Sequence, residues 1–588
     1  MARIQVRDLP WNPYAYSDLQ KSMEAIQRKL ARSKSYCSLS KIPVGIARKL
    51  SDACPFPSFF EYMTRCLYDP DFGYYTAGHV EFGSKHHFFT YSGEMSPVFG
   101  WMLAEAFLSL LQALLGKKVI PDKAPLTILE LGGGEGILAR DVVEYISNHS
   151  RDVRWENIAN RIQYVIIEKS SYLCELQEKN LKDYTRSGCV KIIHGDACRL
   201  EWEGCFYGIV FANEFIDAFP CERIKIHGTE YNVSRIHSIP YLKERASDDG
   251  TQFPSDLNFL ADKGSSPISS VGLWSYIANS RLPLDTTTKM DFAELEVHIS
   301  LGWLDKEMKS HYPPDSLISY LKAISPLISD LEDNGLLPTE LNWSPLLLKF
   351  MNNLSCLIQG VERCGMALFI DYGGTSRHVI DPCSLGPHLR TYGVDEPVVD
   401  EAMLYNRPGY QDITWDIDFS EMARLAEDVG LETIFFGHQA AVEMSSMNLL
   451  NNICLKELLR TVQRNRKLNP DLARLAALAL VARFREAPNF RMILFCSPEL
   501  NGIGHFFGSN DPLKTEELYT ISPNMNKADF KQWLSRKGLS RELADFLKPC
   551  GDPIADLSDL RLYRFRKPVM NWLRKKGYLL PPKTVSDT

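Results

Sequence analysis

The chain lacks the cysteine spacing that zinc sites and disulfide frameworks require. Its 14 cysteines are scattered over 588 residues, and no two of them form a C-x-x-C pair. This pattern excludes the common zinc-binding motifs and the scaffolds of small disulfide-rich secreted domains. Scattered cysteines are typical of a reducing compartment, and we expect no metal site.

Long apolar runs are also missing. The longest candidate, Leu475 to Ala482, is flanked by Arg474 and Arg483, whereas a membrane-spanning helix needs about 18 apolar residues. Neither a secretory signal nor an internal repeat is visible. We therefore expect neither a membrane span nor a repeat architecture.

Charge is unevenly distributed along the chain. The net charge is −7, but residues 1–50 carry ten Lys and Arg against three Asp and Glu, and residues 501–588 carry fifteen against ten. The body between them is therefore acidic. Basic ends favour an acidic partner such as RNA, although a solvated surface is the simpler explanation for either end alone. The Arg-, Lys- and Ser-rich start also fits a mitochondrial transit segment, whose cleavage the sequence leaves open.

The most informative segment is LTILELGGGEGILA, from Leu126 to Ala139. An apolar run up to Leu131 is typical of a buried strand, a helical pattern follows, and glycines occupy the turn between them. Glycine permits positive φ and close approach of a ligand, and a helix start attracts polar or anionic groups. The order is G-x-G-x-G, unlike the G-x-G-x-x-G of dinucleotide sites. A preceding acid suits the ammonium of S-adenosyl-L-methionine, so the candidate cofactor residues here are Glu130, Gly132, Gly134 and Gly136.

Three further apolar runs predict strands that each end in a polar side chain. Gln163 to Glu168 ends in an acid that can bind a ribose diol, and Val190 to Asp196 ends in one that can accept from an adenine amino group. Tyr207 to Asn213 ends in an amide. Open parallel α/β sheets bind ligands at the carboxyl edge of their strands, so we expect the three end residues to gather there.

The segment after the fourth strand carries residues suited to substrate chemistry. It reads FANEFIDAFP from Phe211 to Pro220, and Glu214 and Asp217 are three residues apart. On a helix these carboxylates would share one face, where they could hold a guanidinium in bidentate fashion and polarise its nitrogen. We take Asn213, Glu214 and Asp217 as candidate catalytic residues, although either carboxylate could instead cap a helix or pair inside the fold.

With these residues identified, the chain resembles the MidA-like family of mitochondrial complex I assembly-factor arginine methyltransferases. The resemblance covers about 40–223 and 365–497. Its segments, in order, are Phe60 to Tyr75 (FEYMTRCLYDPDFGYY), Phe89 to Gly100 (FTYSGEMSPVFG), Glu130 to Gly136, Glu168, Gln177, Asn213 to Pro220, Asp371 to Gly373 and Gly409 to Phe419 (GYQDITWDIDF). The resemblance implies a class I methyltransferase core, S-adenosyl-L-methionine as cofactor, a protein arginine substrate and mitochondrial (matrix) or bacterial residence.

The chain departs from the family pattern on the substrate side. His86 and His87 stand where the family usually has Gly-Asp, in a loop expected to fold over the cofactor. The family's histidine after Tyr392 is not evident, and a basic tail from Pro498 to Thr588 extends beyond the family's usual end. These changes leave the cofactor pocket plausible and leave open whether the two histidines abolish activity.

The expected fold is α/β, with a Rossmann-like class I methyltransferase sheet, a large insertion and added helical, basic terminal extensions. Gly365 to Gly374 predicts a fifth strand that resumes the sheet, Trp101 to Leu115 and Phe419 to Val429 predict helices, and Pro55 to Gly100 reads as loop-like. The predicted segments are a basic N-terminal part (1–50), the first part of the core (51–223), the insertion (224–364), the rest of the core (365–498) and a basic C-terminal extension (499–588).

Two functions from different classes fit this organisation. The first is a methyltransferase that modifies a protein, such as a respiratory complex I subunit, during assembly. The second is a methyltransferase fold kept as an assembly scaffold for a mitochondrial ribosome, contacting ribosomal proteins and gripping rRNA through basic segments. Its candidate RNA-binding residues are Arg460, Arg464, Arg466, Lys467, Arg561, Tyr563, Arg564, Phe565, Arg566, Lys567, Trp572, Arg574, Lys575 and Lys576. RNA methylation ranks last, because no N-P-P-Y-like motif follows the fourth strand.

Overall fold

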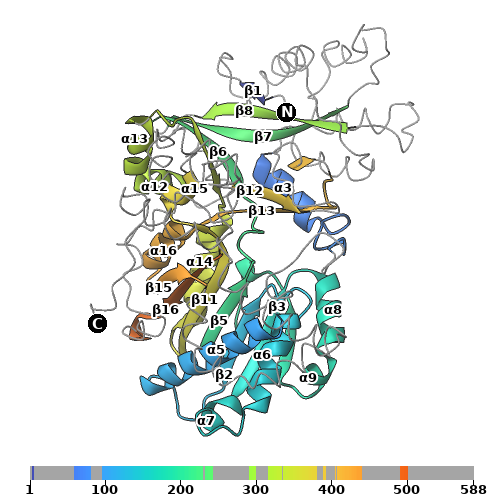
Figure 1. Cartoon of the computed structure of the whole chain (residues 1–588), viewed down its shortest axis with the longest axis vertical. Coiled ribbons are helices and arrows are strands. Elements are labelled where there is room, and N and C mark those ends of the chain that lie inside the picture. Colours follow the sequence, from blue (N-terminus) through green and yellow to red (C-terminus); the bar gives the residue numbers. More distant parts are fainter. Residues whose placement is uncertain are drawn as a thin grey trace, which may run out of the picture.

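The main element of the computed structural model is a mixed β-sheet. The structure describes residues 3–5, 58–80, 96–228, 232–242, 290–299, 316–333, 335–380, 388–392, 404–405, 407–439 and 490–500. The sheet contains β2 (Leu126–Leu131), β3 (Ile162–Glu168), β4 (Val190–His194), β5 (Phe206–Asn213), β11 (Arg363–Gly374), β15 (Glu432–His438) and β16 (Phe490–Cys496), and the short β10 (Gln359–Gly360) and β14 (Ile417–Asp418) pair with β11. The long strands lie in the order β15-β16-β11-β5-β2-β3-β4 (Figure 1).

The strand order creates a topological switch point between β2 and β5. From β4 to β11 all neighbours are parallel, and β16 is inserted antiparallel between β11 and β15. The chain runs outward from β2 to β4 and then restarts on the other side of β2, at β5. The carboxyl ends of five parallel strands therefore share one edge, where α/β sheets bind ligands. The expected α/β fold, Rossmann-like sheet and five strands are confirmed.

Helices cover both faces of this sheet. On one face α5 (Val98–Gly116) and α6 (Ile137–Asn148) pack in one apolar cluster with Ile128 of β2. On the other face α14 (Leu346–Ile358) and α16 (Phe419–Asp428) pack with Leu129. Successive strand residues point to opposite faces, so a strand buried on both sides has a continuous apolar sequence.

Helix α5 corrects the expectation about apolar runs. Within the described part of the chain it is the helix long and apolar enough to cross a membrane by length and composition. However, 78% of its most apolar window is buried inside the protein. It packs against α6 and the sheet, so its apolar character is explained by its place in the core.

The sequence suggested that the segment between Pro55 and Gly100 is loop-like, but part of it is helical. Helix α3 occupies Phe59–Tyr68, and Ser58 begins it with a capping box: its hydroxyl accepts from the Glu61 N–H, and the Glu61 carboxylate accepts from the Ser58 N–H. Such a cap satisfies two of the free donors at a helix start. The signal was present as Ser followed by Glu three positions later, ahead of an apolar pattern.

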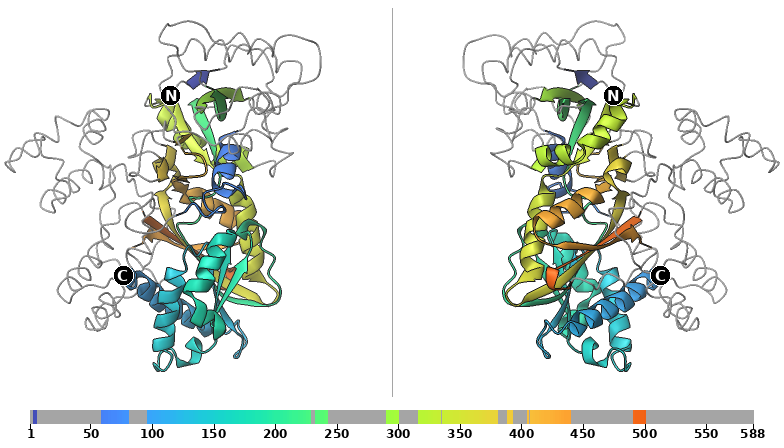
Figure 2. Two further views of the ribbon diagram at one scale, coloured as in Figure 1. Left: turned by 90° about the vertical axis from the view of Figure 1, so that its right-hand side faces the viewer. Right: turned by 90° about the vertical axis from the view of Figure 1, so that its left-hand side faces the viewer.

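A second sheet lies at one end of the molecule, beyond the main sheet (Figures 1 and 2). Its strands are β1 (Arg3–Gln5), β6 (Glu222–Gly228), β7 (Asn232–Leu242), β8 (Met290–Ile299) and β9 (Thr339–Trp343), in the order β1-β8-β7-β6-β9. Helices α12 (Ser316–Ala323) and α13 (Ser325–Asp333) pack with it around a separate apolar cluster. Most of this unit falls in the segment expected to be an insertion, and the five segment boundaries stay predictions.

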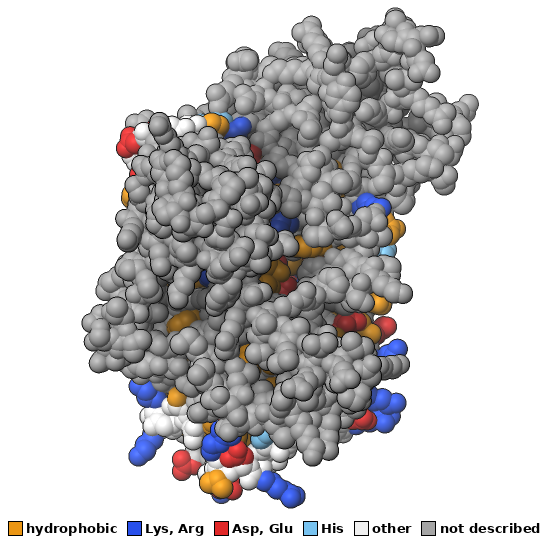
Figure 3. Space-filling view, viewed as in Figure 1, with side chains coloured by type: hydrophobic (Ala, Val, Ile, Leu, Met, Phe, Trp, Pro, Cys, Tyr) orange, Lys and Arg blue, Asp and Glu red, His pale blue; other side chains and the backbone are white. Residues whose placement is uncertain are grey.

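Several expectations fall on residues outside the described ranges. They are His86 and His87, the apolar run Leu475 to Ala482, the candidate RNA-binding residues, and both terminal segments apart from Arg3–Gln5 and residues 499–500. In Figure 3 the described side chains near α7 (Glu156–Ala159), at the lower end of the molecule, are a mixture of basic and acidic groups. That part of the visible face therefore has no patch of one sign.

Candidate active site

The glycine turn between β2 and α6 has the backbone that the sequence predicted. Gly132, Gly134 and Gly136 have φ of 68°, 52° and 78°, a region that side chains with a Cβ rarely adopt. A Cβ on Gly132 would lie 2.7 Å from Cδ2 of Phe215, so the chain after β5 packs directly on the turn. Gly136 ends the turn as the N-cap of α6.

Glu130 lies beneath the turn and is almost completely buried. Its Oε2 accepts a 2.9 Å hydrogen bond from the Tyr164 hydroxyl. Burial raises the pKa of Glu130 to about 7, and the nearby Glu168 adds to the rise. A carboxylate in this position is stabilised by a nearby cation, and the ammonium of a cofactor is one that would suit it.

Glu168 ends β3 at the same edge. It is buried, its Oε1 accepts from the Ser170 N–H at 2.9 Å, and burial raises its pKa to about 7. Beside it Gln177, on α8 (Ser171–Asn180), donates from Nε2 to the carbonyl of Gly134. The Oε1 of Gln177 is buried without a hydrogen-bond partner among the described residues. A buried acceptor left open beside the glycine turn is suited to a donor group of a bound cofactor.

Asp196 follows β4 and is partly engaged within the protein. Its Oδ1 accepts from the Cys198 N–H, and its Oδ2 lies 3.1 Å from Nζ of Lys169. The Lys169 ammonium also lies 4.6 Å from the ring centre of Tyr68. Asp196 thus reaches the predicted edge, but part of its hydrogen-bonding capacity is used by its neighbours.

The segment after β5 is a turn, which corrects the assumption of a helix there. Residues 214–219 form bends and turns, and Glu214 has a left-handed φ of 50°. The Nδ2 of Asn213 donates to Oε1 of Glu214 at 3.0 Å, and the Oδ1 of Asn213 is buried without a partner among the described residues. Glu214 and Asp217 still interact electrostatically, so the turn brings them together without a helical face.

Asp217 points into a group of buried carboxylates. Burial raises its pKa well above the usual range, and the charges of Asp371, Asp412 and Glu214 raise it further. Asp371, near the end of β11, holds the turn: its Oδ2 accepts from the N–H groups of residues 215, 216 and 217 at 2.8–3.2 Å. Burial nevertheless raises the pKa of Asp371 to about 7.

Asp412 completes this group from β13 (Asp412–Trp415). It is fully buried, and burial raises its pKa to about 7 although Tyr75 donates to its Oδ2. Tyr75 follows α3 and stacks on Tyr68, with ring centres 5.7 Å apart. We call Asp217, Asp371 and Asp412 the carboxylate cluster.

An antiparallel ribbon of β12 (Leu389–Tyr392) and β13 packs over the cluster. Arg390 pairs with Thr414 and Tyr392 with Asp412, so these four residues share one face of the ribbon. The Arg390 guanidinium forms an ion pair with Asp416 and lies 5.1 Å from the ring centre of Tyr372. Although burial opposes ionisation, Arg390 and His388 hold the pKa of Asp416 well below its usual range.

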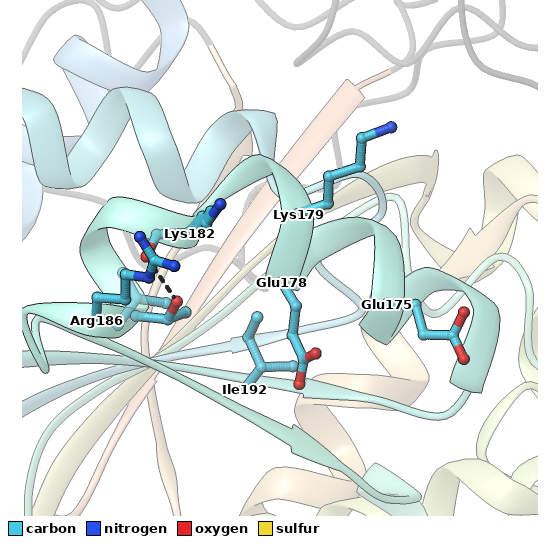
Figure 4. Close-up of a pocket in the computed structure, with 8 residues that line it drawn as sticks. Glu175, Glu178, Lys179, Lys182, Arg186 and Ile192 are labelled. Atoms are coloured by element: carbon cyan, nitrogen blue, oxygen red, sulfur yellow. Dashed lines mark hydrogen bonds between the residues drawn. The ribbon is translucent and has the colours of Figure 1, made fainter.

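The structure therefore brings together all the predicted site residues at the carboxyl edge of the sheet. Sequence reasoning missed the roles of three of their neighbours, Asp371, Asp412 and Tyr75. All three lay in segments that carried the family resemblance, but only folding shows that they share one site. A separate surface depression of about 540 Å³ (Figure 4) is lined by charged residues of α8 and α9 (Lys182–Arg186) and by the start of β4. It lies toward the amino end of β4, away from this edge.

Comparison with known proteins places the chain in a family. Residues 102–437 match a family model described as "Putative S-adenosyl-L-methionine-dependent methyltransferase". The mitochondrial protein arginine methyltransferase NDUFAF7 homolog of Drosophila melanogaster is 26% identical over 263 residues, which are 41% of this chain and 53% of that protein. The chain thus spans about half the length of this curated relative.

Solved structures of low sequence identity also match. A COG1565 superfamily member from Burkholderia thailandensis bound to S-adenosyl-homocysteine is 17% identical, with a TM-score of 0.49 over 79% of this chain and 96% of that one. The native structure of such a protein from the same organism gives a TM-score of 0.48 at 17% identity, over 80% and 98%.

The family model covers more than half of the chain, and its cofactor fits the geometry of the site. The positive-φ glycine turn, the buried Glu130 and the open acceptor of Gln177 all suit S-adenosyl-L-methionine. The chain belongs to this family of S-adenosyl-L-methionine-dependent methyltransferases.

Proposed function

We propose that this protein is a mitochondrial protein arginine N-methyltransferase. The observation that carries the proposal is the carboxylate cluster at the carboxyl ends of β5 and β11, next to the glycine turn. Asp217, Asp371 and Asp412 are each at most 2% exposed. Buried carboxylates without enough cations are unfavourable, so such a site favours a ligand that brings a positive charge. A guanidinium brings that charge together with planar donors that match carboxylate oxygens.

In this proposal each carboxylate has its own role. Glu214 and Asp217 hold and orient the guanidinium, and Asp412 adds a third negative charge from the opposite wall. The charge of a bound guanidinium favours the ionised form of Asp217, and this carboxylate can then accept the proton that the attacking nitrogen loses. The cofactor supplies an electrophilic methyl group on a sulfonium. The protein then accelerates the transfer mainly through position and electrostatics.

The name of the Drosophila relative supports both the arginine substrate and the mitochondrial location. We further propose that the substrate is a subunit of a respiratory complex modified during assembly, of the complex I type, with the protein in the matrix. For the scaffold alternative, the candidate RNA-binding residues lie outside the described ranges, so no contact in the structure favours it.

The test uses the purified full-length chain with radiolabelled S-adenosyl-L-methionine and mitochondrial protein extract. We expect label on arginine of a small number of proteins. Glu214→Gln should abolish transfer, because one of the two carboxylates that hold the guanidinium is lost. The variant should retain its affinity for the cofactor, measured by calorimetry. Cofactor binding without label in any protein would contradict the enzyme. Unchanged transfer by Glu214→Gln would remove Glu214 from the mechanism.

A further inference from the structure

Three side chains able to ligate a metal meet at the end of the ribbon, next to the Leu389–Trp415 pair. They are His378 on α15 (Ser376–Ile380), His388 just before β12, and Asp416 between β13 and β14. Nδ1 of His388 lies 3.0 Å from Oδ2 of Asp416, and Nε2 of His378 lies 4.0 Å from the same oxygen. The three ligand atoms all lie within 4.8 Å of one another.

The Asp416 carboxylate is already oriented for a ligand. Arg390 binds its Oδ1, so its Oδ2 is turned toward both imidazoles. Ligating carboxylates in metal sites are typically held by such a second partner, which fixes their direction. The positive charge of Arg390 also acts on Asp217. The Arg390 guanidinium is therefore shared between two carboxylates, Asp416 and Asp217.

Position and packing also suit a small cation. In a tetrahedral zinc site with bonds of about 2.0–2.1 Å, ligand atoms are roughly 3.3 Å apart. The two separations from Asp416, 3.0 and 4.0 Å, lie on either side of this value, and the two imidazole nitrogens lie within 4.8 Å of each other, so an ion would have to draw the imidazoles together. The side chains of His378 and His388 are 9% and 17% exposed, which places the group just beneath the surface. A cation therefore has a short route in.

The identity of the ligands narrows the choice of metal. Zinc and iron(II) both accept two imidazole nitrogens and one carboxylate oxygen, with water completing the set, and zinc, which has no redox chemistry, suits a site that only holds two elements together. Magnesium and calcium prefer sets of oxygen ligands. This site could not be predicted from the sequence, because the three residues are separated by 10 and 28 positions and follow no zinc-site spacing.

We propose that His378, His388 and Asp416 form a zinc site that fastens the ribbon to α15. The site is separate from the cofactor turn. Asp416 lies four residues after Asp412, and Arg390 belongs to the ribbon face that covers the carboxylate cluster. A bound ion would therefore rigidify the wall that carries Asp412. The inference does not rest on the proposed arginine substrate, since binding and stability can be measured without any transfer.

The experiment titrates Zn²⁺ into chelator-treated, full-length protein by calorimetry at neutral pH and repeats the titration by thermal unfolding. We expect one ion to bind with Kd of about 1 μM or tighter and to raise the melting temperature. His378→Ala and His388→Ala should each weaken binding at least tenfold and remove the thermal shift. His194→Ala is the matched control, because this histidine is exposed, forms a hydrogen bond with the Lys169 carbonyl, and lies outside the proposed zinc site.

His388→Asn separates ligand loss from misfolding. Its amide can still donate to Asp416, but it is a poor zinc ligand. We expect it to retain native cofactor affinity and to lose the tight zinc site. Co²⁺ substitution should give tetrahedral absorption bands in the wild type and not in this variant. Absence of Zn²⁺ binding to the wild type, or equal binding by wild type and the folded His388→Asn variant, would overturn the proposal.

Discussion

The Tyr75 hydroxyl donates a 2.9 Å hydrogen bond to Oδ2 of Asp412, across 337 positions of the chain. This bond joins the turn after α3 to the ribbon that covers the carboxyl edge of the sheet. Both side chains also interact with Asp217. The charge of Asp217 raises the pKa of Tyr75, and the charge of Asp412 raises the pKa of Asp217. The substrate side of the site is therefore assembled from three distant segments.

Asp412→Asn should weaken methyl transfer while leaving cofactor binding unchanged. The substitution keeps the size of the side chain and an oxygen that can accept from Tyr75, but it removes one buried negative charge opposite the guanidinium. Loss of one partner of a buried charged pair costs about 2–5 kcal/mol. We expect kcat/KM to fall by roughly 100-fold, measured with an arginine-containing substrate.

Tyr75→Phe is the matched comparison for this variant. It removes the hydrogen bond and keeps the Asp412 charge, so its effect on kcat/KM should be clearly smaller than that of Asp412→Asn. Equal losses in the two variants would mean that Asp412 acts through Tyr75 and not through its charge.

Stability should fall as pH rises through the range in which the buried carboxyl groups ionise. Burial raises the pKa of Asp371 and Asp412 to about 7, from the usual value of about 4 in an unfolded chain. A carboxyl group whose pKa is higher in the folded than in the unfolded chain adds to the free energy of unfolding. This contribution is complete below the pKa of the unfolded state and is lost as pH rises through the folded-state pKa of about 7. The melting temperature without substrate should therefore be higher at pH 6 than at pH 8.

For Asp412→Asn, the direction of the change in stability with pH can be predicted. An amide does not ionise, so the variant should lose part of this pH dependence and gain stability at pH 8 relative to wild type. The low pKa of Asp416 does not interfere, because that carboxylate stays ionised throughout this range. A variant curve parallel to that of wild type would show that Asp412 does not titrate there.

How much of this site could be read from the sequence depends on the range of the contacts. The strand, glycine turn and helix around Gly132 are local, because apolar runs and glycines report backbone conformation directly. Asp412 could not be assigned, since its role depends on a ribbon folding back over β5. The three-residue spacing of Glu214 and Asp217 would put them on one face if the segment were helical. The segment is instead a turn, because the N–H groups of residues 215–217 bind Asp371, from a strand more than 150 positions later.

Gly132→Ala should weaken cofactor binding by more than its local backbone strain explains. The new Cβ would lie 2.7 Å from Cδ2 of Phe215, and φ of 68° is unfavourable for alanine. Phe215 is held by its backbone bond to Asp371, so the turn must shift away from the residues at the strand ends. Gly188→Ala is the control: its φ is 79°, and its Cβ would meet nothing within 4 Å. Calorimetry with S-adenosyl-homocysteine should show affinity reduced at least tenfold for Gly132→Ala and unchanged for Gly188→Ala. Equal affinities in the two variants would show that the turn does not hold the cofactor.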